Sequence, residues 1–83
     1  MNKTIVEIVI PVAQKTFEAF LPMHLSGFEA LALIAKIAEE TTDHLFIADD
    51  ETTLCREEDG SILDLSLPLW RQGLKNGDKL LLI

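Results

Sequence analysis

The chain has 83 residues, of which 48% are hydrophobic, and it carries a formal net charge of −7 at pH 7. This length predicts one domain over residues 1–83 with a single core and too little volume for a deep enclosed active site, so we expect no enzymatic activity. The acidic residues gather in the middle of the chain, where they would repel a phosphate backbone and argue against nucleic-acid binding. They would attract a basic protein partner or simply keep the surface solvated.

The number of cysteines and the hydropathy of the chain indicate its cellular compartment. Cys55 is the one cysteine of the chain, which allows no intramolecular disulfide, and the N-terminal region lacks the form of a signal peptide. The longest helical apolar stretch, Ala30 to Ala38, is interrupted by Lys36 and is shorter than the roughly 20 residues that span a bilayer. We therefore expect a cytoplasmic protein that does not insert directly into a membrane.

The first two elements are predicted to be strands. Residues Thr4 to Ile10 are rich in β-branched types and end at Pro11, which cannot donate to a strand ladder. Residues Lys15 to Leu21 alternate in polarity and end at Pro22. Because the link between these runs is short, we expect them to form a hairpin.

A helix is predicted next. Ser26 and Glu29 have the spacing of a capping box, so the helix should begin here and continue to about Glu40. Helical spacing predicts a core stripe and, on a further arc, apolar side chains that a single sheet need not cover. The stripe consists of Ala30, Leu33, Ile34 and Ile37, and the further arc of Phe28, Leu31 and Ala35.

The second half of the chain is predicted to add two or three short strands. Leu45 to Ile47 is either a loop or a brief strand, Thr52 to Arg56 is a better strand, and Ser61 to Leu65 can pair back as an edge strand. Lys79 to Ile83 is the final strand. On the segment before it, Trp70 is expected to fill one end of the core or, alternatively, to serve as an exposed anchor for a partner.

A hairpin, a helix and further strands in this order predict an α+β fold of the ubiquitin-like β-grasp type. It would have a mixed sheet of four to five strands and one helix packed on one face. The stretch Leu69 to Leu80 contains Gly73-Leu74-Lys75-Asn76-Gly77-Asp78-Lys79-Leu80, which is similar to the Gly-Ile/Leu-x-x-Gly-Asp-x-Leu ending of one bacterial group. On this motif the whole chain resembles the YukD/EsaB family, ubiquitin-like accessory components of type VII secretion systems in Gram-positive bacteria.

The resemblance implies a non-enzymatic protein that assists or regulates a secretion machine in the membrane. The family lacks a conjugation tail, and this sequence ends at Ile83 without a Gly-Gly pair, which favours binding over conjugation. The acidic stretch from Asp49 to Asp59 departs from the family pattern. A sulfur carrier or protein modifier remains an alternative, as does an interaction adaptor in an unrelated pathway.

Residue types that carry chemistry are sparse. His24 and His44 have no cysteine or carboxylate at metal-ligand spacing beside them, and the acidic turns lack the alternating register of a calcium loop. Cys55 lies in a predicted strand, where a buried or half-buried side chain is the default. We therefore predict no catalytic residue, metal or cofactor.

The outer face of the sheet is the predicted binding surface. If Glu7 and Glu18 point to solvent, the alternation of a strand places five large apolar side chains on the face away from the helix. These are Ile5, Val9, Phe20, Leu81 and Ile83. Clustered together, they would form a patch of roughly a few hundred Å², the size at which exposed apolar surface indicates an interface. Either a protein partner or a second copy in a homodimer could cover it.

Overall fold

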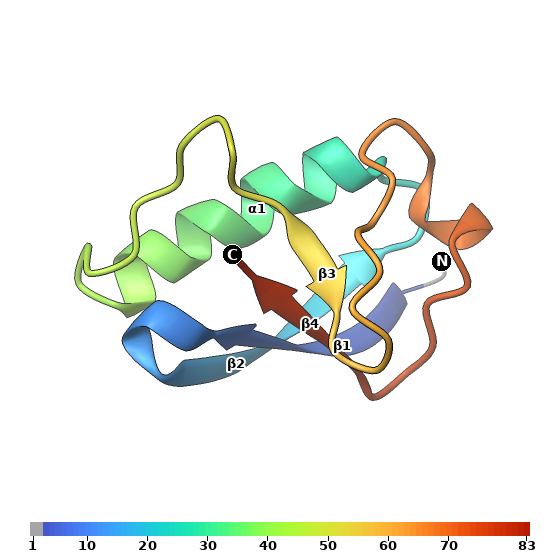
Figure 1. Ribbon diagram of the computed structural model, residues 1–83. Helices are drawn as coiled ribbons and strands as arrows, with labels where there is room; N and C mark the ends of the chain where they lie inside the picture. The colour runs from blue at the N-terminus through green and yellow to red at the C-terminus, as the bar shows by residue number, and fades with distance from the viewer. Residues whose placement is uncertain (1–2) are drawn as a thin grey trace.

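The computed structural model describes residues 3–83, which form one four-stranded sheet with a helix across one face (Figure 1). The strands are β1 (Lys3–Ile10), β2 (Lys15–Pro22), β3 (Leu54–Arg56) and β4 (Asp78–Leu82), and the helix is α1 (Gly27–Thr41). The strand order is β2-β1-β4-β3. The central strands β1 and β4 are parallel, whereas both outer pairs are antiparallel. The predicted β-grasp arrangement is confirmed.

The hairpin forms where the sequence predicts it. Pro11 begins a short 3-10 helix, η1 (Pro11–Ala13), and Gln14 reverses the chain in the left-handed conformation with φ of 52°. Pairing then continues in register from Ile10 opposite Lys15 to Lys3 opposite Pro22. The long antiparallel ladder fixes which side chains of both strands face the helix.

The predicted capping box begins α1. The Glu29 N–H donates to Ser26 Oγ at 3.1 Å, and the Ser26 N–H donates to Glu29 Oε1 at 2.9 Å. At the other end, the Thr42 hydroxyl donates to the Ala38 carbonyl at 2.8 Å and accepts from the Phe46 N–H at 3.0 Å. Both helix ends therefore find partners for backbone groups that the helix itself leaves unpaired.

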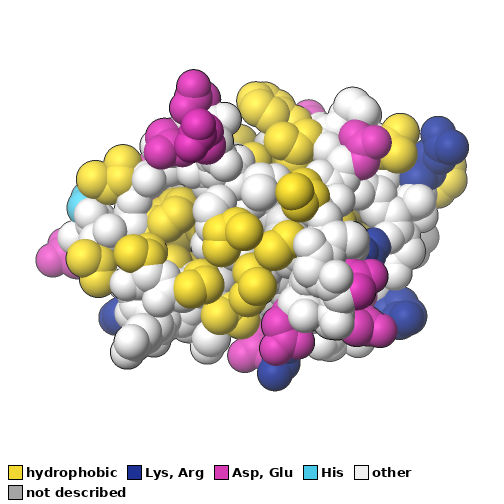
Figure 2. All heavy atoms as spheres, viewed as in Figure 1, with side chains coloured by type: hydrophobic (Ala, Val, Ile, Leu, Met, Phe, Trp, Pro, Cys, Tyr) yellow, Lys and Arg dark blue, Asp and Glu magenta, His cyan; other side chains and the backbone are white. Residues whose placement is uncertain are grey.

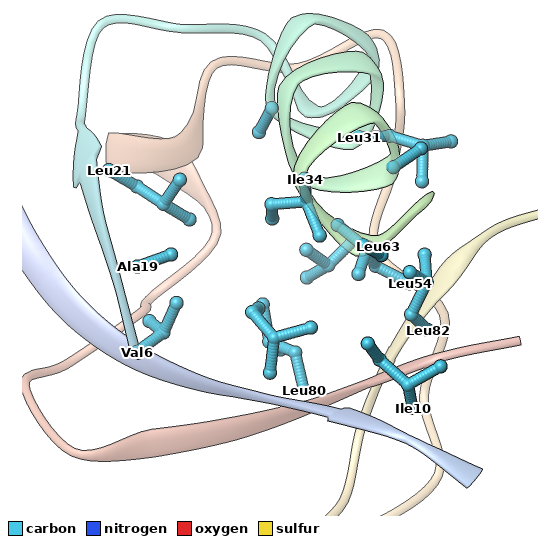
Figure 3. Close-up of a cluster of buried hydrophobic side chains, with 14 of the residues drawn as sticks. Val6, Ile10, Ala19, Leu21, Leu31, Ile34, Leu54, Leu63, Leu80 and Leu82 are labelled. Carbon is cyan, nitrogen blue, oxygen red and sulfur yellow. The ribbon is translucent and has the colours of Figure 1, made fainter. Parts of the chain in front are cut away.

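The core lies between α1 and the inner face of the sheet (Figure 3). The strands contribute the side chains that alternate with the outer-face residues. Val6, Ile8, Ile10, Ala19, Leu21, Leu80 and Leu82 are buried there, while Phe17 is half-buried at the margin. The helix contributes Ala30, Leu31, Ile34, Ala35 and Ala38.

The predicted rotation of the helix is wrong in part. Leu33 is 42% exposed and Ile37 is only half-buried, whereas Leu31 and Ala35 from the further arc are buried. In Figure 3, Leu31 lies on the same side as Leu54 and Leu63, which come from the long segment after the helix. That segment packs on the Leu31 side of α1 and leaves Phe28, the third residue of the arc, 64% exposed. The helix pattern alone does not reveal this packing.

The segment between α1 and β4 contains less strand than predicted. Leu45 to Ile47 is a loop in which Phe46 is buried while Leu45 and Ile47 are exposed. The strand β3 is confined to three residues, and the predicted edge strand from Ser61 to Leu65 is reduced to a single bridge between Cys55 and Ile62. Backbone bonds from the Arg56 N–H to the Ser61 carbonyl at 2.8 Å and from the Leu63 N–H to the Leu54 carbonyl at 2.9 Å flank this bridge.

Trp70 does not fill the core. It lies in the 3-10 helix η2 (Leu69–Arg71) and is 65% exposed, whereas the adjacent Leu69 is fully buried. Backbone bonds from the Leu69 N–H to the Leu25 carbonyl at 2.8 Å and from the Trp70 N–H to the Met23 carbonyl at 3.1 Å hold η2 against the turn before α1. With the backbone held in this way, Leu69 takes the core position and Trp70 the solvent position.

Candidate protein-binding face

The registers of the strands arrange the outer face of the sheet in rows. Ile5 lies opposite Phe20, and the Gly77 N–H donates to the Ile5 carbonyl at 2.9 Å. This first row therefore runs from β2 through β1 to the turn before β4. We name its two apolar side chains the Ile5–Phe20 patch. Ile5 is half-buried, and Phe20 is 59% exposed.

The second row is charged. Glu18 lies opposite Glu7, and Glu7 lies opposite Lys79 across the parallel pair. The Lys79 Nζ is 3.9 Å from Glu7 Oε1, and both side chains are well exposed to solvent. These ion-paired side chains cross the centre of the outer face.

The third row is apolar again. Val9 lies opposite Leu81, Leu81 opposite Cys55, and Cys55 is bridged to Ile62. Because residues opposite each other in a sheet share a face, Ile62 extends this row beyond the edge of β3. Ile83 follows Leu81 by two residues and is also exposed. We name Val9, Ile62, Leu81 and Ile83 the C-terminal patch.

The five predicted residues are all at outer-face positions, but they do not form one cluster. Ile5 and Phe20 lie on one side of the Glu7–Lys79 row, and Val9, Leu81 and Ile83 on the other. Ile5 and Val9 are four residues apart on one strand, a spacing of roughly 13 Å. The parallel pairing of β1 and β4 is the cause, since it places Leu81 level with Val9 and leaves only the 73–78 turn beside Ile5.

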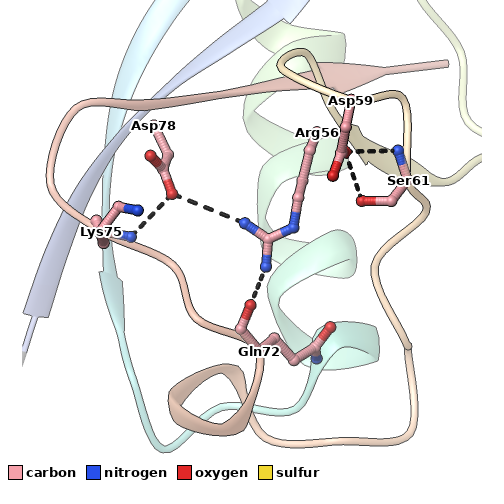
Figure 4. A network of polar contacts seen from close by, with 6 residues as sticks. All are labelled: Arg56, Asp59, Ser61, Gln72, Lys75 and Asp78. Carbon is pink, nitrogen blue, oxygen red and sulfur yellow. Dashed lines mark hydrogen bonds and ion pairs between the residues drawn. The ribbon is translucent and has the colours of Figure 1, made fainter.

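Polar contacts fix the turn that brings β4 into place (Figure 4). Arg56 Nη1 is 3.8 Å from Asp78 Oδ2, and Arg56 Nη2 donates to the Gln72 carbonyl. The Lys75 N–H donates to Asp78 Oδ2 at 2.9 Å, and the Asn76 side chain accepts from the Ile5 N–H at 3.0 Å. These contacts tie β3 and β1 to the start of β4 and so set the register on which both patches depend.

The C-terminal patch has four apolar side chains, whereas the Ile5–Phe20 patch has two. Figure 2 shows hydrophobic side chains gathered around the end of β4, where Figure 1 marks the C-terminus. In the same view, acidic side chains gather at the tip of the loop between α1 and β3, where Asp49, Asp50 and Glu51 are exposed. In this view, the end of β4 therefore lies below an acidic loop.

Sequence reasoning did not identify Ile62 as part of this surface. Its position follows from the bridge to Cys55, a contact between residues on either side of an acidic turn. The side chain is 67% exposed, and Ser61 to Leu65 was expected to pair as a strand. A strand assignment with alternation from Leu63, which is buried, would have placed Ile62 on the outer face.

The described residues offer little support for a metal site, for a reactive cysteine or for a membrane-spanning helix. Within residues 3–83, no group of three or more His, Cys, Asp or Glu side chains is placed to hold a metal ion. Cys55 is buried, as predicted. Across the same range, no helix combines the length and the apolar character that crossing a bilayer requires.

Comparison with known proteins identifies the fold. No protein-family model matches the sequence, and no curated protein matches it. Among solved structures, the EccD5 ubiquitin-like domain from Mycobacterium xenopi is similar, with a TM-score of 0.81 and 22% identity, over 100% of this chain and 94% of that one. The ubiquitin-like domain of the Mycobacterium tuberculosis type VII secretion system protein EccD1 has a TM-score of 0.68 and 21% identity, over 100% and 99% of the two chains.

A chain of the ESX-5 inner membrane complex free of MycP5 is also similar. Its TM-score is 0.82 at 17% identity, and the match covers 100% of this chain but 21% of that one. The fold is therefore the ubiquitin-like β-grasp, as predicted. These neighbours include ubiquitin-like domains of type VII secretion components, and membership of the YukD/EsaB family stays a prediction.

Proposed function

We propose that this chain is a non-enzymatic, ubiquitin-like interaction domain that serves a type VII secretion system as an accessory or regulatory component. Two independent lines support the proposal. The terminal Gly-Leu-x-x-Gly-Asp-x-Leu motif resembles that of the YukD/EsaB family, and similar solved structures include domains of the type VII components EccD1 and EccD5. Its place of action would be the cytoplasmic side of the secretion machinery.

The single observation that carries the docking site is the C-terminal patch. Val9 and Leu81 are half-buried and level with each other on the two central strands, and Ile62 and Ile83 are exposed beside them. Val9 and Leu81 are held on paired strands, so little conformational entropy of their backbone is lost when a partner covers them. We propose that Val9, Leu81 and Ile83 form the centre of the interface, and that Ile5 and Phe20 contact the partner across the charged row.

The test compares the wild type with Leu81→Asp. Each protein is tagged at its N-terminus, expressed in cells that encode the secretion system, and recovered after detergent solubilisation. We expect membrane components of the secretion machinery with the wild type and not with Leu81→Asp. Phe28→Asp is the matched control, because Phe28 is 64% exposed on the helix, away from the outer face of the sheet.

Three results would contradict the proposal. Recovery of an adenylating or sulfur-transfer enzyme would favour the carrier or modifier class, and recovery of partners unrelated to secretion would favour an adaptor of another pathway. A wild type that retains only further copies of itself, and loses them in Leu81→Asp, would show that the patch is a homodimer interface.

A further inference from the structure

The outer edge of β2 carries backbone groups to which no other segment of residues 3–83 bonds. β2 is the terminal strand of the sheet and spans eight residues. Ile5 turns its N–H towards the Asn76 side chain and its carbonyl towards the Gly77 N–H, on the β4 side of β1. Ile5 therefore exchanges no ladder bond with Phe20, the residue opposite it on β2.

The alternation of an antiparallel ladder extends this result along β2. Because Ile5 and Phe20 are a pair without ladder bonds, Phe20, Glu18 and Thr16 all direct their N–H and carbonyl groups away from β1. Within residues 3–83, no other segment bonds to these groups. Three N–H and carbonyl pairs thus lie along one edge of the sheet, which is a template for an additional strand.

Apolar side chains flank this edge on the inner side. In Figure 3, Ala19 and Leu21 of β2 lie on the opposite side of the core from Leu31, which faces Leu54 and Leu63. At 100° per residue, Leu33 and Ile37 lie on the other side of Ile34 from Leu31, and so on the flank of α1 towards β2.

Leu33 and Ile37 on this flank are partly exposed to solvent, and so is Phe17 on the inner face of β2. A strand added to β2 would extend the sheet beneath this flank, with every second side chain directed towards Leu33 and Ile37. Apolar residues fit those positions.

Charge defines the outward side of such a strand. Glu18 is at the centre of the free edge and lies opposite Glu7, whose cation partner is Lys79. Among the described residues, no cation pairs with Glu18. A Lys or Arg opposite Glu18 would supply the missing charge, and the net charge of −7 favours a basic segment generally.

We infer that the free edge of β2 binds an extended segment of a partner protein, in which apolar residues alternate with basic ones, by strand addition. The segment pairs with Thr16, Glu18 and Phe20, places its apolar side chains against Leu33 and Ile37, and places a cation beside Glu18. This site is separate from the C-terminal patch.

A second copy of this chain is a poorer occupant. The symmetric antiparallel pairing centred on the edge would place Glu18 directly opposite Glu18 of the second copy, and like charges in that position are destabilising. It would also join two molecules that each carry a net charge of −7.

The experiment uses the ¹⁵N-labelled protein and a capped peptide of about seven residues in which valine alternates with lysine, a length typical of a strand. We expect amide shifts confined to β2 and to the flank of Leu33 and Ile37, together with slower hydrogen exchange at Thr16, Glu18 and Phe20. Glu18→Lys should weaken binding by about tenfold and allow a valine–glutamate peptide to bind instead. Leu33→Asp should also weaken binding of the lysine peptide.

Controls separate this site from the proposed docking face. Phe28→Asp lies on the opposite flank of α1, and Leu81→Asp on the outer face, and both should bind the lysine peptide like the wild type. Shifts centred on β4 and Ile83, unchanged affinity in Glu18→Lys, no binding of the lysine peptide, or self-association through β2 would each overturn the inference. None of these outcomes affects the separate test of the proposed function, which compares the wild type with Leu81→Asp for recovery of secretion components.

Discussion

Glu7 on β1 and Lys79 on β4 lie opposite each other across the parallel pair at the centre of the sheet, with Lys79 Nζ 3.9 Å from Glu7 Oε1. An exposed ion pair of this kind contributes at most about 1 kcal/mol to stability. Its larger consequence is spatial, because it separates the Ile5–Phe20 patch from the C-terminal patch. The outer face therefore presents two apolar surfaces divided by charge.

Removing the charge at the centre should join the two patches. We expect Lys79→Leu to change the free energy of unfolding by less than about 1 kcal/mol and to increase self-association, since the apolar surface becomes continuous. Sedimentation velocity over a range of concentrations measures the effect. The control is Lys36→Leu, the same substitution on the exposed face of α1. An equal rise in self-association for Lys36→Leu would show that the effect does not depend on joining the two patches.

Leu81→Asp should leave the fold intact. Leu81 is half-buried on the outer face, whereas its neighbours Leu80 and Leu82 fill the core. We therefore expect circular dichroism and the amide spectrum to remain those of a folded protein while partner binding is lost. Leu80→Asp, which buries a charge, should unfold the chain. If Leu81→Asp unfolded as Leu80→Asp does, this result would contradict the assignment of Leu81 to the outer face and Leu80 to the core.

Two adjacent helix residues should differ sharply in their importance. Ile34→Ala should lower the free energy of unfolding by about 2 to 5 kcal/mol, because the side chain is fully buried beneath the sheet. Leu33→Ala should cost less than about 1 kcal/mol, since Leu33 is partly exposed. Urea unfolding of both variants measures the difference, and equal losses would show that α1 has a different rotation.

Gly27→Ala should destabilise the start of α1. A Cβ at Gly27 would lie 2.5 Å from the Asp64 carbonyl oxygen and 2.9 Å from the Leu65 Cα. Both are backbone atoms, held there by bonds from the Gly27 N–H to Leu67 and from the Phe28 N–H to Leu65.

We expect a loss of about 1 to 3 kcal/mol for this overpacking, measured by urea unfolding. Lys36→Ala, at an exposed helix position, should change stability by about 0.5 kcal/mol or less. A Gly27→Ala protein as stable as the wild type would mean that the 64–67 segment moves aside freely.

Stability should fall at acid pH through two aspartates. The Ser61 backbone N–H and hydroxyl donate to Asp59, and the Ser66 hydroxyl and N–H donate to Asp64, which lowers the pKa of each carboxyl below 3.8. A carboxyl whose folded pKa is depressed adds stability above its unfolded pKa and loses it as pH falls through the folded value.

The free energy of unfolding should therefore decline as pH falls below 3.8, measured by urea unfolding across that range. Asp59→Asn and Asp64→Asn should each reduce this decline, because an amide does not titrate. Both side chains are exposed, so the effect of each is small. An unchanged pH dependence in the double variant would assign the acid sensitivity to other groups.

Local patterns in the sequence determined the elements with the strongest signals. The hairpin follows from two alternating runs closed by Pro11 and Pro22, and the capping box at Ser26 and Glu29 positions the start of α1. Each depends on residues close together in the chain, so its signal needs no tertiary information. The same alternation placed Ile5, Val9, Phe20, Leu81 and Ile83 at outer-face positions.

The tertiary structure decided what depends on long-range pairing. The rotation of α1, and hence the exposure of Leu33, follows from the segment containing Leu54 and Leu63, and the exposure of Trp70 follows from the bonds of η2 to the turn before α1. The parallel register of β1 and β4 places Lys79 beside Glu7 and divides the outer face. A parallel register is set by contacts between distant residues, so no local pattern in either strand contains it.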